Sequence, residues 1–578
     1  MALTGLCDGA SLLQISMVVY ADGSDLIFSG VKNESFNKQS IDAKSQTQFD
    51  YVIVGAGSSG CVLADRLSAS GRYTVCLLEA GPRGHNPWLH IPIGYAKTMF
   101  HRRYNWKFYT EPEPGLHNRQ IYWPRGKVLG GSSAINGLIY IRGQHQDYDQ
   151  WAERGNAGWS WADVRPYFIR SERNQRGASV DHGDSGPMGV SDVKRPNPLA
   201  EAFVQACAQA GYLRNPDFNG QNQEGAGFYQ LTTWNGFRSS SAIAYLKPAR
   251  HRSGLHIVTD ARVEQIKFQD NRARAVVYRR GHTEHTVLVG REIILSAGAV
   301  QSPQLLQLSG IGEACRLQQF GIPVVQDLPE VGQNLQDHLQ VRLIHRTTHP
   351  GTTNSQMRDP WSWLCMGISY VLSRSGPMAV GINQAGAFIR SSDAVDRPDI
   401  QFHFAALSAD LPGAPLHSFP GFTSSVCQLR PTSRGSVTLK SRDAQAAPAI
   451  CPNYLTTEHD RLTVVAGLKT GRQIAAQPAL NTHISAEYRP GNSVQSDDEL
   501  LAFAQETGVT TFHPVGSCRM GSDDRAVVDV RLRVRGVTGL RVVDCSVMPT
   551  LVSGNTHAAA VMIGEKGADM ILQDAERS

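Results

Sequence analysis

Three glycines in a short turn near the start of the chain constrain the fold more than any other feature. Gly55, Gly57 and Gly60 follow the apolar run 50–54 and precede a helical pattern of apolar residues. The first glycine permits a tight turn, the second lets the backbone approach a pyrophosphate, and the third lets a helix pack closely on a strand. The spacing therefore predicts a strand, a turn and a helix that bind a dinucleotide.

A second apolar run completes this unit. Residues 74–78 form a predicted strand that ends at Glu79, nineteen positions after Gly60. A carboxylate at this point can accept a hydrogen bond from a ribose hydroxyl and would repel a 2′-phosphate, which disfavours NADP. The pattern predicts an α/β fold with a doubly wound domain of the Rossmann type, but it does not distinguish NAD from FAD.

Two longer motifs make that distinction. Residues 125–137 read RGKVLGGSSAING, and residues 298–312 read GAVQSPQLLQLSGIG. Together, and in this order, they resemble the two signatures of the glucose-methanol-choline oxidoreductases. The resemblance extends from Phe49 almost to the C-terminus, and it implies FAD as the cofactor.

The resemblance also implies which residues contact the cofactor. The paired Gly130 and Gly131 would bring backbone amides against the phosphates and the isoalloxazine ring. In some choline-oxidising relatives a histidine beside the asparagine of the first motif carries the flavin covalently, and Ile135 stands there in this chain. Isoleucine has no nucleophile, so we expect FAD to be bound non-covalently. The expected cofactor contacts are Gly55, Gly57, Gly60, Glu79, Val128, Gly131, Asn136, Val263, Asp544 and Thr556.

His513 is the candidate catalytic base. It lies in the segment TFHPVGSCRMG at 511–521, which resembles the motif of the family's catalytic histidine. An alcohol must lose its hydroxyl proton as hydride leaves its carbon, and imidazole is the side chain whose ordinary pKa lies near neutrality. Cys518 and Arg519 in the same segment are interpreted as a packed thiol and a structural cation.

Asn555 is the candidate for the second catalytic position. This position is histidine in glucose-oxidising members of the family and asparagine in many choline-type members. The amide would donate to the substrate oxygen, but asparagine also favours helix N-caps, and both roles stay open. The helix expected to begin at Thr556 would direct its positive end at the flavin. His557 is an alternative for the second role.

The order of motifs divides the chain into four segments. We expect a loose N-terminal extension (1–48), a mostly FAD-binding part (49–345), a mostly substrate-binding domain on an antiparallel sheet (346–509), and a C-terminal return to the FAD domain that carries the catalytic residues (510–574). For the extension, a signal peptide and an upstream start codon, with Met17 as the true start, are the alternatives.

Three details of the middle of the chain are also predicted. A short helix is expected from Ser302, with Pro303 at its first position, where proline is tolerated. Residues 346–509 are expected to alternate strands and turns. Within them, residues 402–404, Trp361 and Trp363 are interpreted as pocket lining or as plain core, with core the favoured choice.

Composition excludes several classes of protein. The 578 residues carry a net charge of only +5, with Lys and Arg scattered, so no nucleic-acid partner is expected. The ten cysteines are spaced singly without a CxxC pair, so we expect neither a metal site nor a disulfide framework. This favours a reducing, cytoplasmic location. The chain contains no run of eighteen apolar residues, so no transmembrane helix is expected, and peripheral membrane contact is left open.

These features predict FAD-dependent oxidation of an alcohol, preferably a primary one, to a carbonyl compound. The proton would pass to His513 and hydride to the flavin. The expected partners are a small-molecule alcohol and oxygen or a quinone as electron acceptor. The alternatives are a non-oxidative lyase or light-driven decarboxylase on the same scaffold, a nicotinamide-dependent dehydrogenase, and a flavin-binding protein without activity.

Overall fold

The computed structural model describes residues 47–577. The backbone separates into two units, 1–45 and 46–578, and the following description concerns the second. The predicted extension, 1–48, therefore lies outside the described residues except for its last two positions. Of these, Gln48 already belongs to the first strand, β1 (Gln48–Val54).

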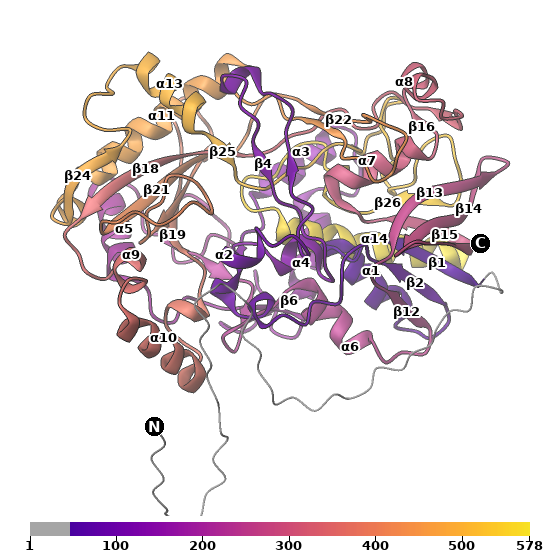
Figure 1. Ribbon diagram of the computed structural model, residues 1–578, viewed down its shortest axis with the longest axis horizontal. Coiled ribbons are helices and arrows are strands. Elements are labelled where there is room, and N and C mark those ends of the chain that lie inside the picture. Colours follow the sequence, from indigo (N-terminus) through magenta and orange to yellow (C-terminus); the bar gives the residue numbers. More distant parts are fainter. Residues whose placement is uncertain (1–46, 578) are drawn as a thin grey trace, which may run out of the picture. The chain divides into compact units, whose positions relative to one another are not determined.

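A seven-stranded sheet forms the core of the dinucleotide-binding domain that the glycine motif predicted (Figure 1). The order is β12-β2-β1-β15-β14-β13, with β26 paired to β15. The strands β2, β12, β1 and β26 are parallel to their neighbours, whereas β13, β14 and β15 form an antiparallel ribbon. Their bounds are β2 (Val75–Leu78), β12 (Leu255–Val258), β13 (Arg262–Gln269), β14 (Arg272–Arg280), β15 (Thr283–Leu295) and β26 (Leu540–Val542).

The three glycines of the first motif lie in the turn between β1 and helix α1 (Ser58–Ser68). Gly55 has a φ of +98°, which favours glycine. A Cβ on Gly60 would lie 2.0 Å from the Gly55 carbonyl oxygen, so the third glycine permits the close contact of helix and strand. The motif thus meets the steric requirements from which it was predicted.

The helix of the second motif differs from the prediction. Helix α7 (Gly298–Leu308) begins four residues before Ser302, so Pro303 lies in its interior. Proline has no N–H and cannot bond the carbonyl one turn earlier, which belongs to Ala299. The Ser517 hydroxyl donates to that carbonyl at 2.6 Å. A residue of the His513 segment therefore compensates for the proline.

The chain returns to the first sheet near its C-terminus. β26 pairs with β15, and helix α14 (His557–Arg577) packs against α1, where the Ser59 hydroxyl donates to the Ala560 carbonyl at 2.7 Å. The helix expected to begin at Thr556 is present and begins one residue later. Asn555 and Thr556 immediately precede α14.

A second sheet supports the other lobe and is wholly antiparallel, as predicted. Its order is β24-β18-β21-β20-β19-β8, with β25 paired to β18. The bounds are β8 (Gly225–Phe228), β18 (Leu339–Thr347), β19 (Asn383–Ile389), β20 (Ile400–Ala405), β21 (Gly421–Gln428), β24 (Ile484–Arg489) and β25 (Val509–Thr510). β8 and part of β18 come from before residue 346, so this sheet draws on more than the expected segment.

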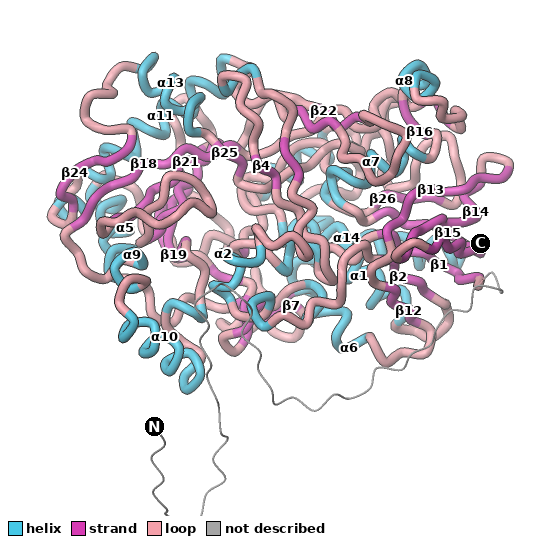
Figure 2. The backbone as a smooth tube through the Cα atoms, in the orientation of Figure 1, coloured by secondary structure: helices cyan, strands magenta, loops and turns pink. Residues whose placement is uncertain are grey.

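The expectation of only strands and turns in 346–509 was wrong. This segment also contains helices α10 (Pro360–Ser373), α11 (Glu458–Ala475) and α13 (Asp497–Thr507). By contrast, residues 105–143 are mostly loop (Figure 2), with two-residue strands such as β3 (Phe108–Tyr109) and β4 (Tyr122–Trp123). That stretch contributes to the walls of the site described below.

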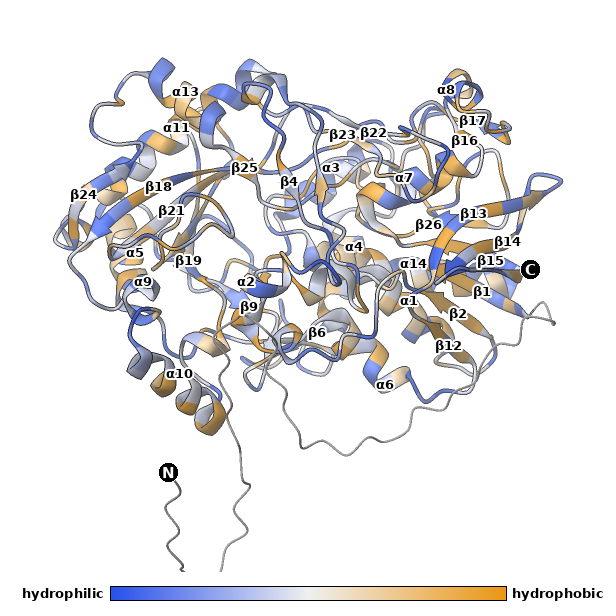
Figure 3. Ribbon diagram, in the orientation of Figure 1, coloured by the Kyte–Doolittle hydropathy of each residue, from blue (hydrophilic) through white to orange (hydrophobic). Residues whose placement is uncertain are grey.

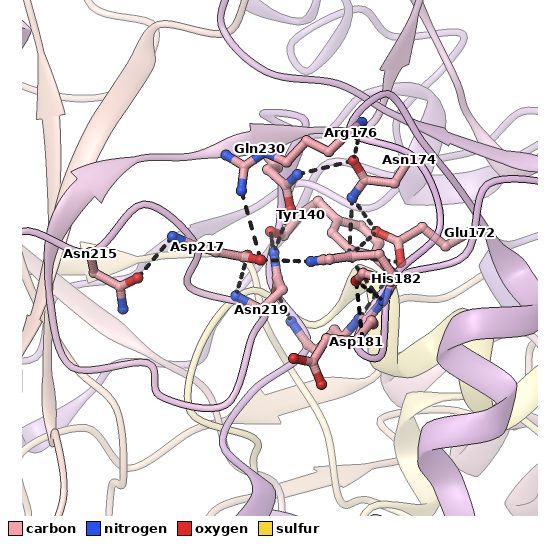
Figure 4. A network of polar contacts seen from close by, with 12 residues as sticks. Tyr140, Glu172, Asn174, Arg176, Asp181, His182, Asn215, Asp217, Asn219 and Gln230 are labelled. Carbon is pink, nitrogen blue, oxygen red and sulfur yellow. Dashed lines mark hydrogen bonds and ion pairs between the residues drawn. The ribbon is translucent and has the colours of Figure 1, made fainter.

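A buried polar network connects four separate segments of the chain (Figure 4). Arg142 and Glu172 form an ion pair whose side chains are almost fully buried. His182 lies 3.0 Å from a Glu172 oxygen and 2.7 Å from an Asp217 oxygen, so one imidazole joins two carboxylates. Burial opposes charge on His182, but the bonds to Asp217 and Glu172 outweigh it and raise its pKa to about 9.

This network predicts a pH-dependent contribution to stability. The folded pKa of His182 lies above its ordinary value of 6.5. Its charge therefore stabilises the fold fully below pH 6.5, and the contribution is lost as the pH rises through about 9. We expect His182→Gln to lower the urea unfolding midpoint strongly at pH 6.5 and much less at pH 9.5. A difference between the two proteins that stays constant with pH would contradict this.

Candidate active site

A cavity of about 520 Å³ extends from the glycine turn to the second sheet. At one end it is lined by Gly55, Gly57 and Glu79, and at the other by His513 and Asn555. Residues from both ends of the chain thus meet around one space. Eight of the ten predicted cofactor residues and both predicted catalytic residues adjoin the same cavity.

The glycine end is formed by backbone packed against backbone. The Gly130 N–H donates to the Ala56 carbonyl at 2.8 Å, and a Cβ on Gly131 would lie 2.7 Å from the Gly57 Cα. Glu79 follows β2 directly and accepts from the backbone N–H groups of Ala56 and Gly81. Burial raises its pKa to about 7. A side chain at Gly131 would clash with the glycine turn, so the space beside it stays open to a ligand.

The remaining predicted cofactor residues fall into two groups. Gly60 and Val128 lie outside the cavity lining. The Val128 carbonyl accepts a hydrogen bond from the Gly131 N–H at 2.7 Å. Their contribution to the site is therefore indirect. The residues that do line the cavity are Gly55, Gly57, Glu79, Gly131, Asn136, Val263, Asp544 and Thr556.

Two of these lining residues are fixed by strong hydrogen bonds. The Asn136 amide oxygen accepts from the Arg238 guanidinium at 2.6 Å. Asp544 accepts from the Ser302 hydroxyl at 2.6 Å and from the Gly298 N–H at 2.9 Å, and so holds the start of α7. Both side chains are oriented before any ligand arrives.

The backbone at His513 is held in an unusual conformation. Phe512 has a φ of +70°, which is unfavourable for an aromatic residue. Its carbonyl accepts from the Arg125 guanidinium at 2.6 Å, and the His513 N–H donates to Asp337 at 2.7 Å. Arg125 opens the first signature motif, so that motif helps to position the candidate base.

The hydrogen bonds of His338 define the tautomer of His513. His338 Nε2 lies 2.8 Å from the Leu429 carbonyl, which only accepts, so this nitrogen carries the hydrogen. Neutral His338 then has a bare Nδ1, and His513 Nδ1, 3.0 Å away, must donate to it. The remaining nitrogen of neutral His513, Nε2, is therefore an acceptor. This is the form that a general base requires.

Asn555 adjoins that acceptor. Its Nδ2 lies 3.1 Å from His513 Nε2, and its Oδ1 accepts from Gln401 at 3.3 Å. The side chain is thus bound to His513 and Gln401 rather than to the first turn of α14. His557 lies elsewhere on the cavity wall, with Nε2 3.2 Å from the Ser241 hydroxyl and a buried Nδ1 without a hydrogen bond.

Three buried imidazoles around the site stay neutral at neutral pH. Burial lowers the pKa of His338 and of His403 to about 4. For His513, burial lowers the pKa well below its usual range, and His338, His403 and Arg125 lower it further. The candidate base is therefore unprotonated at neutral pH and can accept a proton.

The structure corrects several expectations for aromatic and neighbouring residues. Phe402 and Phe404 on β20 belong to the core, as favoured, but His403 lines the cavity. Trp361 and Trp363 are neither core nor pocket, because both are exposed on α10. Cys518 is a buried free thiol and Arg519 pairs with Asp523, as interpreted.

Four residues that orient the site were not predicted from the sequence: Gln401, His338, Asp337 and Arg125. Alternation on β20 is the signal that could have identified Gln401, because it shares a face with His403. The adjacent Asp337 and His338, directly before β18, combine two residue types common in active sites. No spacing rule connects them to His513, more than 170 residues later.

Comparison with known proteins assigns the chain to a family. Models of the N-terminal and C-terminal parts of GMC oxidoreductases match residues 49–340 and 431–564. An alcohol dehydrogenase [acceptor] of Pseudomonas putida is 44% identical over 535 residues, covering 91% of this chain and 96% of that protein. The mitochondrial choline dehydrogenase of Homo sapiens is 42% identical over 538 residues, covering 92% and 90%. The chain belongs to the GMC oxidoreductase family.

Solved structures share the fold over nearly the whole length. Pyridoxine 4-oxidase from Mesorbium loti superposes with a TM-score of 0.82 at 32% identity, covering 90% of this chain and 98% of that chain. A formate oxidase gives a TM-score of 0.87 at 26% identity, covering 93% and 100%. The two-lobed arrangement is thus that of known flavoproteins.

The tautomer of His513 can be tested by two substitutions of His338. His338→Leu removes the acceptor for His513 Nδ1–H, and we expect flavin reduction by an alcohol to slow on the order of a hundredfold. His338→Asn places an amide oxygen close to the Nδ1 position, and we expect most of the rate to return. Anaerobic stopped-flow spectroscopy measures both, with FAD content as the control for folding. Equal rates in the two variants would exclude the tautomer effect.

Proposed function

We propose that this chain is an FAD-dependent enzyme that oxidises a primary alcohol to an aldehyde, with His513 as the base. The observation that carries the proposal is the unprotonated Nε2 of His513 beside the Asn555 amide on the cavity wall. A substrate hydroxyl that replaces their direct 3.1 Å contact would donate to Nε2 and accept from Nδ2–H. This pair holds the oxygen and removes its proton.

The residues that line the cavity are compatible with bound FAD. The close approach of Gly57 and Gly131 leaves backbone rather than side chains facing the space, and Glu79 presents a carboxylate at the end of β2. When bound, FAD supplies the hydride acceptor. Residues 55–57, Glu79, Val263 and Gly131 would hold the adenosine and phosphate parts, and Asn136 and Thr556 would face the ring.

We infer that the FAD is held without a covalent bond. Ile135, at the position where some relatives carry an attachment histidine, lines the cavity with a side chain that has no nucleophile. The buried His557 has a free Nδ1 on the wall and is the alternative attachment point that an experiment must exclude. The geometry by itself gives no reason for His557 to react, since Ser241 already orients its ring.

The side chains of His513 and Asn555 accept the hydroxyl proton and position the substrate oxygen, respectively. His513 Nε2 accepts the hydroxyl proton, and the imidazolium so formed keeps its Nδ1–H bond to His338. Asn555, fixed by Gln401, retains the oxygen in place as the carbonyl forms. His403 of β20, in the second sheet, also lines this cavity.

The other candidate functions lack a supporting observation. A lyase or light-driven decarboxylase needs no neutral imidazole poised beside an amide, and a nicotinamide enzyme would leave both long motifs unused. The electron acceptor, oxygen or a quinone, stays a prediction. A cytoplasmic location also stays a prediction; all nine cysteines within 47–577 are free thiols, which is compatible with it.

Substitution of the two catalytic candidates tests their separate roles. We expect His513→Ala to slow anaerobic flavin reduction by an alcohol on the order of a thousandfold, because the base is lost. Asn555→Ala should cost less, since the base remains, and both variants should keep FAD. If His557→Ala proved more damaging than Asn555→Ala, the second role would belong to His557.

The mode of FAD attachment has a direct test. The purified protein should be yellow, and acid precipitation should release free FAD into the supernatant. Flavin that stays in the pellet would contradict non-covalent binding, and its loss from the pellet of His557→Ala would identify the attachment point. Bound NAD in place of flavin would contradict the proposed cofactor.

A further inference from the structure

Helix α10 differs from the other helices within 47–577 because most of its apolar side chains face away from the protein. Its fourteen residues, PWSWLCMGISYVLS, include no charged side chain. Among them only Tyr370 is buried, with its hydroxyl donating to the Gly236 carbonyl at 3.0 Å. The helix therefore rests on the protein through a narrow contact.

The opposite face is an exposed apolar stripe. Trp361 is 69% exposed, Ile368 48% and Leu372 80%, and Leu364 and Val371 complete the stripe at 46% and 58%. The spacing i, i+3, i+7, i+10 and i+11 places all five on one side of a helix. In an ordinary surface helix this stripe would face the core, but here it faces away from the protein.

This concentration of exposed apolar residues is a property of α10 in particular. Of the fourteen large apolar residues that are exposed within 47–577, six lie on this helix. Figure 3 shows orange residues along α10 at the lower left margin of the second lobe. Patches of this kind mark sites that bind another apolar surface.

The size of the stripe argues against a second copy of the chain as the occupant. A helix of fourteen residues is about 21 Å long and about 10 Å wide, so its face covers on the order of 200 Å². A stable dimer buries about 800 Å² on each partner. A convex rod of this area is too small for such an interface, but it can be immersed in the boundary between lipid headgroups and acyl chains.

The ends of the helix match a lipid surface. Arg358 precedes the helix beside its N-cap Asp359, and Arg374 follows it with the guanidinium over the Phe237 and Tyr370 rings. A cationic side chain such as Arg358 attracts anionic headgroups at a membrane surface. Trp361 stands at the N-terminal end of the stripe, and tryptophan is enriched where water meets the bilayer. Within 47–577 no helix is long and apolar enough to cross a membrane, so α10 would lie along the surface rather than span it.

We propose that α10 docks the protein on the surface of a phospholipid bilayer that contains anionic lipid. The helix leads through residues 374–382 to β19, and Ile382 and Asn383 line the cavity. The Ile382 N–H donates to the Tyr95 hydroxyl at 3.2 Å, in the same wall. Docking through α10 therefore brings the lobe that forms this wall of the cavity to the membrane.

Flotation of the FAD-loaded full chain with vesicles tests this. The vesicles contain phosphatidylcholine mixed with phosphatidylglycerol, or phosphatidylcholine alone, because only the mixture carries the negative surface charge that attracts arginine. We expect the parent to float with the anionic vesicles. The variant Trp361→Ser, Leu364→Ser, Ile368→Ser and Leu372→Ser should partition at least about tenfold less. Arg358→Gln should weaken binding about fivefold on anionic vesicles only.

A matched control substitutes equally exposed apolar residues elsewhere. Val180→Ser, Leu213→Ser and Leu462→Ser, at 66%, 77% and 62% exposure, should float as the parent does. All variants should keep their FAD and their rate with an artificial acceptor. The proposal is overturned if the stripe variant floats like the parent, or if the parent does not float. It is also overturned if the parent is a dimer that Leu372→Asp separates, because the stripe would then be an interface between copies.

Discussion

The single hydrogen bond from His338 Nε2 to the Leu429 carbonyl determines the chemistry of the site. A carbonyl cannot donate, so this bond fixes the tautomer of His338, and His338 in turn fixes that of His513. Both histidines are buried. Because charging a buried imidazole costs free energy, burial lowers the pKa of His338 and of His513. A base that would be half protonated near pH 6.5 in water is therefore held neutral with its lone pair toward Asn555.

The two long motifs contribute to the structure beyond any contact with FAD. Arg125 of the first motif holds the Phe512 carbonyl, and thereby the strained backbone before His513. Pro303 of the second motif removes one backbone hydrogen bond from α7. The Ser517 hydroxyl, in the His513 segment, donates to the carbonyl that would otherwise lack a partner. Segments nearly 400 residues apart in sequence are thus connected at the site.

The sequence was most informative where a residue type is required by sterics. The glycine motif predicted the first sheet and its turn, and at Gly55 and Gly60 an added Cβ would clash with neighbouring backbone atoms. His513 and Asn555 were identified through a resemblance, and the structure brings them within 3.1 Å of each other. Their roles remain proposals, but the geometry that those roles need is present.

Prediction failed where tertiary contacts outweigh local pattern. Trp361 and Trp363 were predicted to lie in the core or to line the pocket, whereas α10 exposes both. His338 and Gln401 could not be predicted, since their significance comes from neighbours distant in sequence. The helices of 346–509 were not predicted, although a Ser496–Glu499 capping box marks the start of α13.

The central claim is that His513 is neutral and accepts the alcohol proton, and the pH dependence of flavin reduction tests it most directly. The limiting rate should be measured anaerobically by stopped flow from pH 8 down to pH 5, with circular dichroism to verify folding. Because the pKa of His513 lies well below 6.5, the rate should be constant from pH 8 to pH 6.5 and fall only at lower pH. His513→Ala should show no such fall. A rate that declines through an apparent pKa of about 7 or higher, or the same acid limb in His513→Ala, would contradict the account.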